Sequence, residues 1–205
     1  GESAHAASPE GGKNAQTALL ALLASLPLAP SAGQKAICDL SRLFPYGDNH
    51  GTALGVDQED AISGRLTLVF SKLTFTKTGF EGQYDSRCPI CATNDNMRAV
   101  SEKNFNACGF TFRKKPDMYA PHHTPAESDL CQTLLRTYED YTGQKGECVA
   151  IGGGTYVHEI EGGVAFGCAM PGTDNRMHGA DEFAVIDELM VSAKMFTQVI
   201  LDLCK

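Results

Sequence analysis

The sequence feature that most constrains the fold is an alternating run at residues 64–76, GRLTLVFSKLTFT. Leu66, Leu68 and Phe70 fall on every second position, which predicts a β-strand with one buried face. A turn that contains glycine leads into a second strand-like stretch at residues 78–89, TGFEGQYDSRCP. Two such stretches around a short turn predict an antiparallel hairpin, and other elements must cover its apolar face.

Helical patterns flank this predicted hairpin. Asn14 is a suitable N-cap for a leucine-rich helix, and Pro27 and Pro30 bring that helix to an end. Residues 94–108 predict a second helix, and residues 109–115, GFTFRKK, predict a further strand.

The first half of the chain therefore predicts one α+β domain. Residues 31–63 are mixed, because QKAICDLSRLF has helical spacing whereas PYGDNHG interrupts it. Residues 1–115 together are expected to form an antiparallel sheet with helices on one face.

The second half, residues 116–205, differs in character. Its first stretch, residues 116–129, is rich in proline and is expected to be an extended linker. Helical and apolar strand-like segments then alternate, which suggests α/β layers. Two short strands leave open sheet edges and an uncovered apolar face, so this half looks like a piece of a larger domain. The segments are a helix at 128–143, a strand at 147–151, a helical segment that GGGTY opens, a strand at 163–171, and a helix at 181–204.

Charge and hydropathy exclude some classes of function. The 205 residues carry a net charge of −8, which argues against nucleic acid as a partner because phosphate binding needs a basic face. The most apolar run, residues 18–28, is too short to span a bilayer, so no membrane partner is expected. No targeting signal is visible, and the chain has no initiator methionine, so its natural N-terminus is expected to lie further upstream.

The cysteines favour a reducing compartment. The eight cysteines are scattered along a chain that is too long to need a disulfide framework, which predicts reduced thiols in a cytoplasmic protein. The one close pair, Cys88 and Cys91, forms a CxxC that could be redox-active or half of a zinc site. No second CxxC and no thioredoxin-like context accompanies it.

One histidine, His178, lies in the loop PGTDNRMHGADEF, between a predicted buried strand and the last helix. Functional residues of α/β folds gather at the carboxyl ends of strands, and neutral imidazole is a common zinc ligand. The competing interpretation is a surface histidine in an ordinary loop. Zinc takes about three or four protein ligands, and neither HExxH nor a second histidine at helical spacing accompanies His178.

Three other stretches are candidates for binding. The GGGTY turn, with Gly153, Gly154 and Thr155, could present backbone N–H groups to a carboxylate, or could be a tight strand–helix turn. His5 lies among small residues and could reach a ligand, or could be a solvated loop residue. Arg87 ends a predicted strand and could form a bidentate pair with a carboxylate, or could be a surface charge.

Four stretches together carry a family resemblance: SAHAASPEGGKNA, SRCP, IGGGTYVHEIEGGVAFG and MHGADEF. In order and spacing they resemble the C-terminal part of the dinuclear-zinc dipeptidases of the aminoacylase/carboxypeptidase superfamily. The bacterial dipeptidase V type, which is related to carnosinases and Xaa-His dipeptidases, is the most similar. The resemblance implies a lid domain at residues 1–115, of the kind used for dimerisation and incomplete at its N-terminus. It implies the C-terminal part of a catalytic domain at residues 116–205.

The resemblance also implies an activity and roles for residues. The complete enzyme would be a metallodipeptidase with two zinc ions, hydrolysing Xaa-His or β-Ala-Xaa dipeptides through a metal-bound hydroxide. His178 matches a zinc ligand, and His5 matches the lid histidine that stabilises the oxyanion. Arg87 matches the arginine that holds the substrate's terminal carboxylate, although SRCP departs from the aromatic residue that commonly follows it. The GGGTY turn matches further contacts to the same carboxylate.

The resemblance has consequences for partners and for the chain alone. The remaining zinc ligands and the general base would belong to the N-terminal catalytic portion of the same enzyme, so this chain alone is expected to be inactive. Other members dimerise through the lid, whereas the type with extra lid insertions, which residues 31–63 resemble, is often monomeric. Both a homodimer and a monomer therefore stay compatible with the resemblance.

Two other classes of function remain as alternatives. The chain could be a binding or assembly module in which His178 is incidental. It could also be a thiol-redox protein that uses Cys88 and Cys91, which would require a depressed thiol pKa.

Overall fold

The computed structural model describes residues 1–113, 118–167, 169–177 and 180–204. The chain divides into two compact units, each formed by two stretches of sequence. The first unit is Gly1–Pro121 with Ala150–Gly153, and the second is His122–Val149 with Gly154–Lys205. The assignment of these parts to a lid and a catalytic domain stays a prediction.

The first unit is built around the predicted hairpin. Strand β3 (Thr67–Phe75) pairs antiparallel with β4 (Phe80–Arg87), which confirms the hairpin. Leu66, Leu68 and Phe70 are buried, as the alternation predicts. The register shifts between Phe70 and Lys72, so the strand carries a β-bulge. A two-stranded ribbon precedes the hairpin, formed by β1 (Glu59–Asp60) and β2 (Gly64–Arg65).

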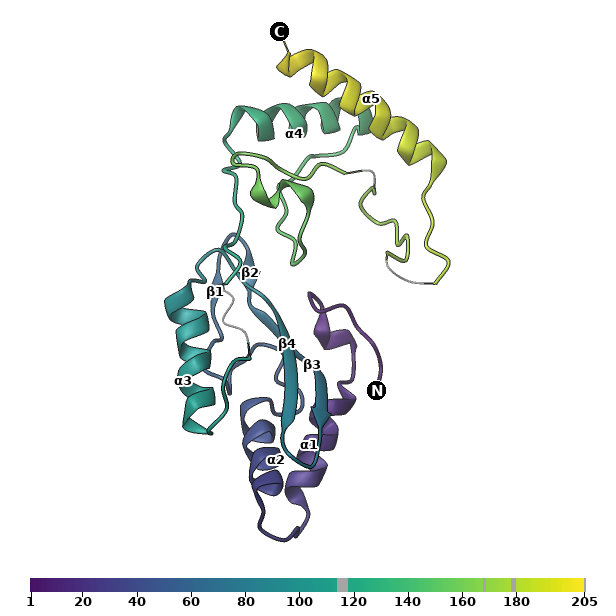
Figure 1. Cartoon of the computed structure of the whole chain (residues 1–205). Helices are drawn as coiled ribbons and strands as arrows, with labels where there is room; N and C mark the ends of the chain where they lie inside the picture. The colour runs from purple at the N-terminus through teal and green to yellow at the C-terminus, as the bar shows by residue number, and fades with distance from the viewer. Residues whose placement is uncertain (114–117, 168, 178–179, 205) are drawn as a thin grey trace. The chain divides into compact units, whose positions relative to one another are not determined.

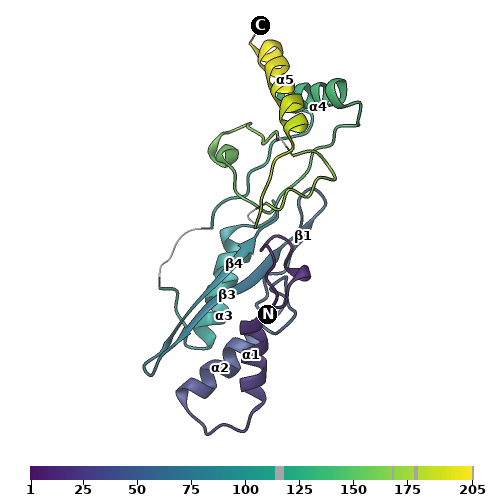
Figure 2. The ribbon, with the colours of Figure 1, turned by 90° about the vertical axis from the view of Figure 1, so that its right-hand side faces the viewer.

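Three α-helices contribute to the apolar core beside this hairpin. Helices α1 (Ala15–Ser25) and α2 (Ala32–Leu43) form a pair, and α3 (Ala99–Ala107) runs alongside the strands (Figures 1 and 2). Phe44 lies at the centre of the core, stacked on Phe70 with ring centroids 4.5 Å apart. Helices and strands therefore share one hydrophobic cluster, which makes this unit an α+β domain. Short helical turns at Pro9–Gly11 (η1) and Asn94–Arg98 (η2) precede α1 and α3.

Asn14 links α1 to the edge of the hairpin. Its Oδ1 accepts hydrogen bonds from the N–H groups of Gln16 and Thr17, which confirms it as the N-cap. Its Nδ2 donates to the carbonyl of Phe70 at 2.8 Å. The side chain of Gln16 donates to the next carbonyl, that of Ser71. The start of α1 thereby satisfies acceptors on the edge of β3.

The predicted strand at 109–115 is not formed in its described part, residues 109–113. Phe110 and Phe112 instead use their side chains for the core. Phe110 meets the ring of Phe80 edge-on at 4.8 Å, and Phe112 meets Phe105 at 5.2 Å. Packing of the aromatic rings replaces strand pairing here.

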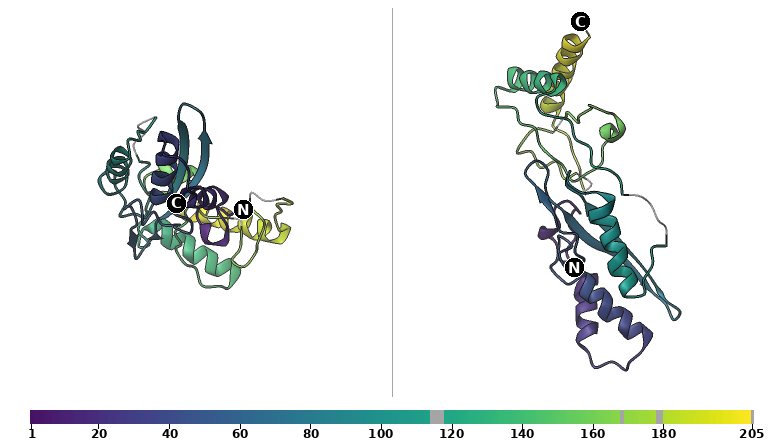
Figure 3. Two further views of the ribbon diagram at one scale, coloured as in Figure 1. Left: turned by 90° about the horizontal axis from the view of Figure 1, so that it is seen from below. Right: turned by 90° about the vertical axis from the view of Figure 1, so that its left-hand side faces the viewer.

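The second unit contains two helices that pack on each other, α4 (Asp129–Thr142) and α5 (Ile186–Leu203) (Figures 1 and 3). Ser128 caps α4, and Gly143 ends it in the left-handed conformation with φ 69°, both as predicted. One 3-10 turn, η3 (Tyr156–Glu159), follows the glycine turn. The residues buried on the two helices are Cys131, Leu134, Thr137, Ser192, Met195 and Val199.

The strands predicted at 147–151 and 163–171 are wrong for the residues that the structure describes, since none of these residues belongs to a strand. Val149 is 79% exposed and Ile151 61% exposed. A buried parallel strand needs hydrogen-bonding neighbours and cover on both faces, which the described residues do not provide. The α/β layers expected for 116–205 are therefore absent from the described part of this region.

The last helix begins later than predicted, at Ile186 rather than at residue 181. The preceding residues form part of a loop, in which Phe183 N–H donates to the carbonyl of Asn175 at 3.2 Å. Asp181 has φ 58°, which a helix cannot accommodate. Among the described helices, none combines the length and the apolar character that a bilayer crossing needs.

Candidate functional site

The loop that carries His5 is tightly folded by its own hydrogen bonds. Ala7 N–H donates to Nδ1 of His5 at 3.2 Å, and Ser8 N–H donates to the carbonyl of His5 at 2.9 Å. Because Nδ1 accepts, the proton of the neutral imidazole is assigned to Nε2. The side chain of His5 is exposed. The loop therefore presents a histidine whose Nε2–H group is suited to donating a hydrogen bond.

Thr67 fastens this loop to the hairpin. Its hydroxyl donates to the carbonyl of Ala6 at 2.7 Å, and the Thr67 side chain is buried. Thr67 is also the Cα partner of Arg87 in the ladder of β3 and β4. The backbone next to His5 therefore lies at the end of the hairpin where Arg87 lies.

Arg87 is the last residue of β4, and its side chain is partly buried at 30% exposure. Its Nη2 donates to Oδ2 of Asp85 at 3.1 Å. Its Nε lies 2.9 Å from Oδ1 of the same carboxylate. This Nε–H is not aligned with that oxygen, and the buried Nε has no hydrogen-bond acceptor among the described residues. Asp85 thus orients the guanidinium and leaves donor capacity for another acceptor.

The first glycine of GGGTY lies against the same two segments. A Cβ atom at Gly152 would be 2.8 Å from Cβ of Ala7 and 3.4 Å from Cβ of Arg87. Only glycine permits this approach without displacement of Ala7. The structure therefore brings together the His5 loop, the Arg87 end of β4 and the start of the glycine turn.

The later residues of the turn are more open. No described atom lies within 4 Å of the Cβ position of either Gly153 or Gly154. Thr155 is exposed, and its side chain makes no capping hydrogen bond to η3. Backbone groups at these positions are sterically accessible to a ligand.

His178 lies outside the described residues, so its role stays a prediction. The described residues that bracket it adopt an uncommon backbone conformation: Arg176 has φ 56° and Asp181 has φ 58°. Their side chains form an ion pair at 3.9 Å. Left-handed conformations at residues other than glycine cost energy and are frequent at functional loops.

The described residues do not form a metal centre by themselves. No group of three or more His, Cys, Asp or Glu residues among them is arranged to hold an ion. The donor set for the expected zinc ions is therefore not supplied by this part of the chain.

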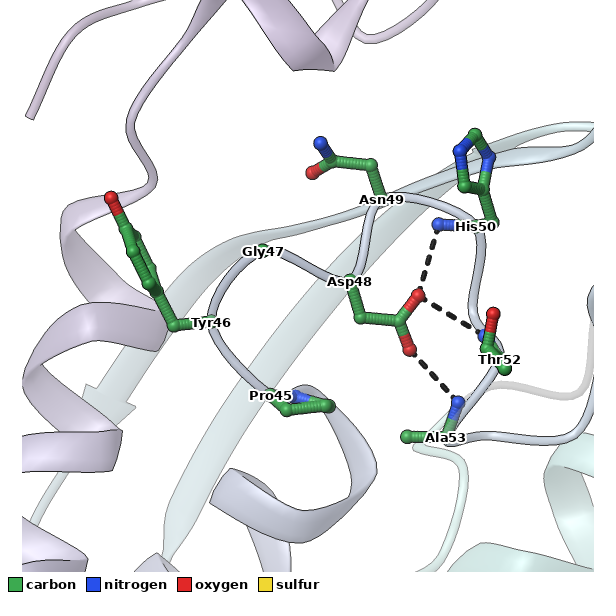
Figure 4. A pocket seen from close by; sticks show the side chains of 8 residues that line it. All are labelled: Pro45, Tyr46, Gly47, Asp48, Asn49, His50, Thr52 and Ala53. Atoms are coloured by element: carbon green, nitrogen blue, oxygen red, sulfur yellow. Dashed lines mark hydrogen bonds between the residues drawn. The ribbon is translucent and has the colours of Figure 1, made fainter.

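A pocket of about 450 Å³ lies elsewhere in the first unit, at a loop whose function the sequence did not indicate. Asp48 lies at its centre, and its carboxylate accepts hydrogen bonds from the N–H groups of His50, Thr52 and Ala53 (Figure 4). His50 Nδ1 lies 2.8 Å from the carbonyl of Leu66. These polar groups serve to fold the loop, so we assign no ligand to this pocket.

The CxxC pair lacks the chemistry of a redox site. Cys88 is half-buried, and burial raises the pKa of its thiol, whereas the nucleophilic thiol of a redox catalyst needs a lowered pKa. The thiols have separate partners: Cys88 Sγ lies 3.7 Å from the hydroxyl of Ser86, and Cys91 Sγ donates to Oε1 of Gln58 at 3.7 Å. This arrangement disfavours the thiol-redox alternative.

Comparison with known proteins adds an independent observation. No protein-family model matches the chain. The chain is 35% identical over 206 residues to the Bacillus subtilis (strain 168) protein named "Putative dipeptidase YtjP". It is 31% identical over 207 residues to the "Beta-Ala-Xaa dipeptidase" of Lactobacillus delbrueckii subsp. lactis. It is 26% identical over 210 residues to a "Putative dipeptidase" of Staphylococcus epidermidis (strain ATCC 12228 / FDA PCI 1200).

These alignments cover the whole of this chain and 43% of each relative. The chain is therefore related over its full length to proteins that are named dipeptidases, and it spans less than half of their length.

Proposed function

We propose that the protein containing this chain is a zinc metallodipeptidase, and that this chain supplies the groups that recognise the C-terminal end of a dipeptide. The observation that carries the proposal is the meeting of three segments at one end of the hairpin. Thr67 joins the His5 loop to the strand opposite Arg87, and Gly152 packs on both segments. The relationship to proteins named dipeptidases supports the same activity.

In this proposal Arg87 binds the α-carboxylate of the substrate. A guanidinium binds a carboxylate through two parallel hydrogen bonds, and partial burial strengthens the interaction. Asp85 holds the guanidinium in place from the same strand. A substrate without a free C-terminal carboxylate would lose this charge-assisted pairing and would bind poorly.

His5 is proposed to stabilise negative charge on the scissile carbonyl oxygen. Its Nδ1 accepts the Ala7 N–H, so the neutral ring can donate through Nε2. A donor that is aimed at the developing oxyanion acts mainly on the transition state. The hydrogen bond from Ala7 N–H to Nδ1 orients the ring, and the one from Ser8 N–H to the His5 carbonyl folds the loop that carries it.

The glycine turn is proposed to bind the same carboxylate through its backbone. Gly153 and Gly154 are unobstructed, so their N–H groups can approach an anion closely. The exposed hydroxyl of Thr155 can add one hydrogen bond. The family resemblance assigns these groups and Arg87 to the same carboxylate, which would favour dipeptides over longer peptides.

The family resemblance is the reason for including zinc in this proposal. Two zinc ions would supply the activated nucleophile for peptide hydrolysis. The described residues do not fit a metal centre, so we derive no step through zinc from this structure. His178 is proposed as one ligand, with the others and the general base in the part of the relatives that this chain does not match.

Two finer assignments also remain proposals. Residues 1–115 would form a lid and residues 116–205 the end of the catalytic domain. A cytoplasmic location would agree with the seven described cysteines, which are all free thiols.

The direct experiment is an assay of the complete protein on β-Ala-His, another Xaa-His dipeptide and a tripeptide. We expect hydrolysis of the dipeptides only, loss of activity after chelation, and recovery with zinc. His178→Ala should abolish turnover, whereas His123→Ala, at an exposed histidine, should not. The isolated 205-residue chain should show no turnover. Full activity of His178→Ala would contradict the metal assignment, and absence of any hydrolysis would favour the binding-module alternative.

A further inference from the structure

The segment that follows α4 runs back along that helix. After the left-handed turn at Gly143, the N–H of Gly146 donates to Oε1 of Glu139 at 3.0 Å. A Cβ atom at Gly146 would lie 3.0 Å from Cδ2 of Leu135 and 3.1 Å from the carbonyl oxygen of Leu135. Gly146 is therefore in direct contact with α4, and the chain after Gly143 runs back along the helix, antiparallel to it.

This arrangement brings two cysteines close to each other. Cys131 lies four residues before Leu135, one helical turn or about 6 Å along the same face of α4. Cys148 lies two residues beyond Gly146, and two residues of chain span up to about 7 Å. The antiparallel course therefore places Cys148 beside Cys131. Burial, with the neighbouring Cys131 as the next cause, raises the pKa of the Cys148 thiol. The thiolate fraction of Cys148 is therefore small, and the pairing depends on the proximity of the two thiols rather than on an activated thiolate.

The two thiols differ in access to solvent. Cys131 is 4% exposed, in the first turn of α4, whereas Cys148 is an exposed residue. A reagent in solution can therefore reach Cys148, and Cys131 is in place to react with the sulfur of Cys148. The CxxC pair lacks this arrangement, because Cys88 and Cys91 contact Ser86 and Gln58 respectively.

We propose that Cys131 and Cys148 are a site of reversible oxidation, at which a low-molecular-weight disulfide such as oxidised glutathione converts the two thiols into one intramolecular disulfide. The Cys148 thiolate attacks one sulfur of the reagent, the reagent S–S bond breaks, and one glutathione leaves as a thiolate that takes up a proton. Cys131 then loses its proton, attacks the sulfur of Cys148 and expels the second glutathione. Two protein thiols are oxidised, and one molecule of the reagent is reduced to two thiols.

The bond would tether the chain just before Val149 to the start of α4. The residues that follow lead directly into the glycine turn at Gly152. Oxidation would therefore restrict the segment that enters this turn. The proposal rests on contacts within the second unit and does not depend on the proposed peptidase activity.

The experiment treats the folded protein with oxidised glutathione, alkylates the remaining thiols, and maps the disulfides by peptide mass spectrometry. We expect a peptide that links Cys131 to Cys148 as the main product, and we expect added dithiol to remove it. Cys148→Ser should abolish this product, whereas Cys91→Ser, at another exposed cysteine, should leave it unchanged. The same treatment in concentrated urea should lower its yield severalfold, because the pairing depends on the fold.

Three results would overturn the proposal. One is accumulation of glutathionylated Cys148 without the link to Cys131. Another is an equal yield of the Cys131–Cys148 link in the folded and the urea-unfolded protein, a comparison that uses the unaltered sequence and needs no variant to fold. The third is a different cysteine pair as the main product in the folded protein.

Discussion

Thr67 lies directly opposite Arg87 in the β3–β4 ladder, and the hydroxyl of Thr67 donates to the carbonyl of Ala6 at 2.7 Å. One buried side chain therefore joins the loop of the candidate oxyanion donor to β3, the strand that pairs with the one carrying the candidate carboxylate-binding group. If His5 and Arg87 act on one substrate, this link helps to fix the distance between them.

The link can be removed while the shape of the side chain is kept. Thr67→Val deletes the hydroxyl and leaves the carbonyl of Ala6 without this donor, at a cost of about 1–3 kcal/mol. We expect kcat on a dipeptide to fall by about tenfold, with a smaller change in KM, because the variant misplaces His5 and leaves Arg87 in its strand. Thr74→Val, at an exposed position of the same strand, is the matched control. Equal kcat values for the two variants would show that the link is unimportant for catalysis.

The role of His5 predicts an effect on turnover rather than on binding. His5→Ala should lower kcat by about a hundredfold, the usual consequence of removing one oxyanion donor, while KM changes little. His123→Ala is the control, since His123 is exposed and lies in the second unit. A rise in KM at unchanged kcat would instead assign His5 to ground-state binding.

The close approach at Gly152 predicts intolerance of any side chain. Gly152→Ala places a methyl group 2.8 Å from Cβ of Ala7, and the resulting displacement should cost about 1–3 kcal/mol. Thermal unfolding should show a lowered midpoint. Gly33→Ala in α2 would place its methyl group no closer than 3.9 Å to its nearest neighbour, the hydroxyl of Ser31, and should keep or raise the midpoint. An unchanged midpoint for Gly152→Ala would mean that this contact does not persist in solution.

The Asp57–Arg65 pair predicts an acid-dependent part of the stability. Hydrogen bonding from Arg65 lowers the pKa of Asp57 from 3.8 to about 2. A lowered pKa in the folded state stabilises the protein above pH 4, and this stabilisation is lost as the pH falls from about 4 to about 2. The contribution is at most about 2 kcal/mol, reduced by screening because Arg65 is about half exposed. Urea unfolding of Asp57→Asn should therefore show a weaker pH dependence in this range than the unaltered protein.

Local patterns predicted the elements whose partners are close in sequence. The hairpin, the cap at Asn14 and the end of α4 at Gly143 each depend on a few neighbouring residues, and each is confirmed. The bulge beside Ser71 was not foreseen, because no local signal in the strand specified an unpaired residue. The strands at 147–151 and 163–171 were wrong because an apolar run becomes a strand only where partner strands are available.

Local sequence patterns could not predict the candidate site either. His5, Arg87 and Gly152 each had an ordinary interpretation as loop, surface or turn residues, and only the family resemblance connected them. Their proximity depends on the contact of Thr67 with Ala6, 61 residues apart, and on that of Gly152 with Ala7. No periodicity or spacing could indicate contacts of this range.

The guanidinium at the end of β4 is proposed to bind the free carboxylate of a dipeptide. The most direct measurement is kcat/KM of the complete protein for β-Ala-His and for its C-terminal amide, with Arg87→Ala and with Arg113→Ala, an exposed arginine of the same unit. We predict that the unaltered protein and Arg113→Ala prefer the free acid by about a hundredfold, and that Arg87→Ala loses this preference together with most of its activity on the acid. An undiminished preference in Arg87→Ala would contradict the account.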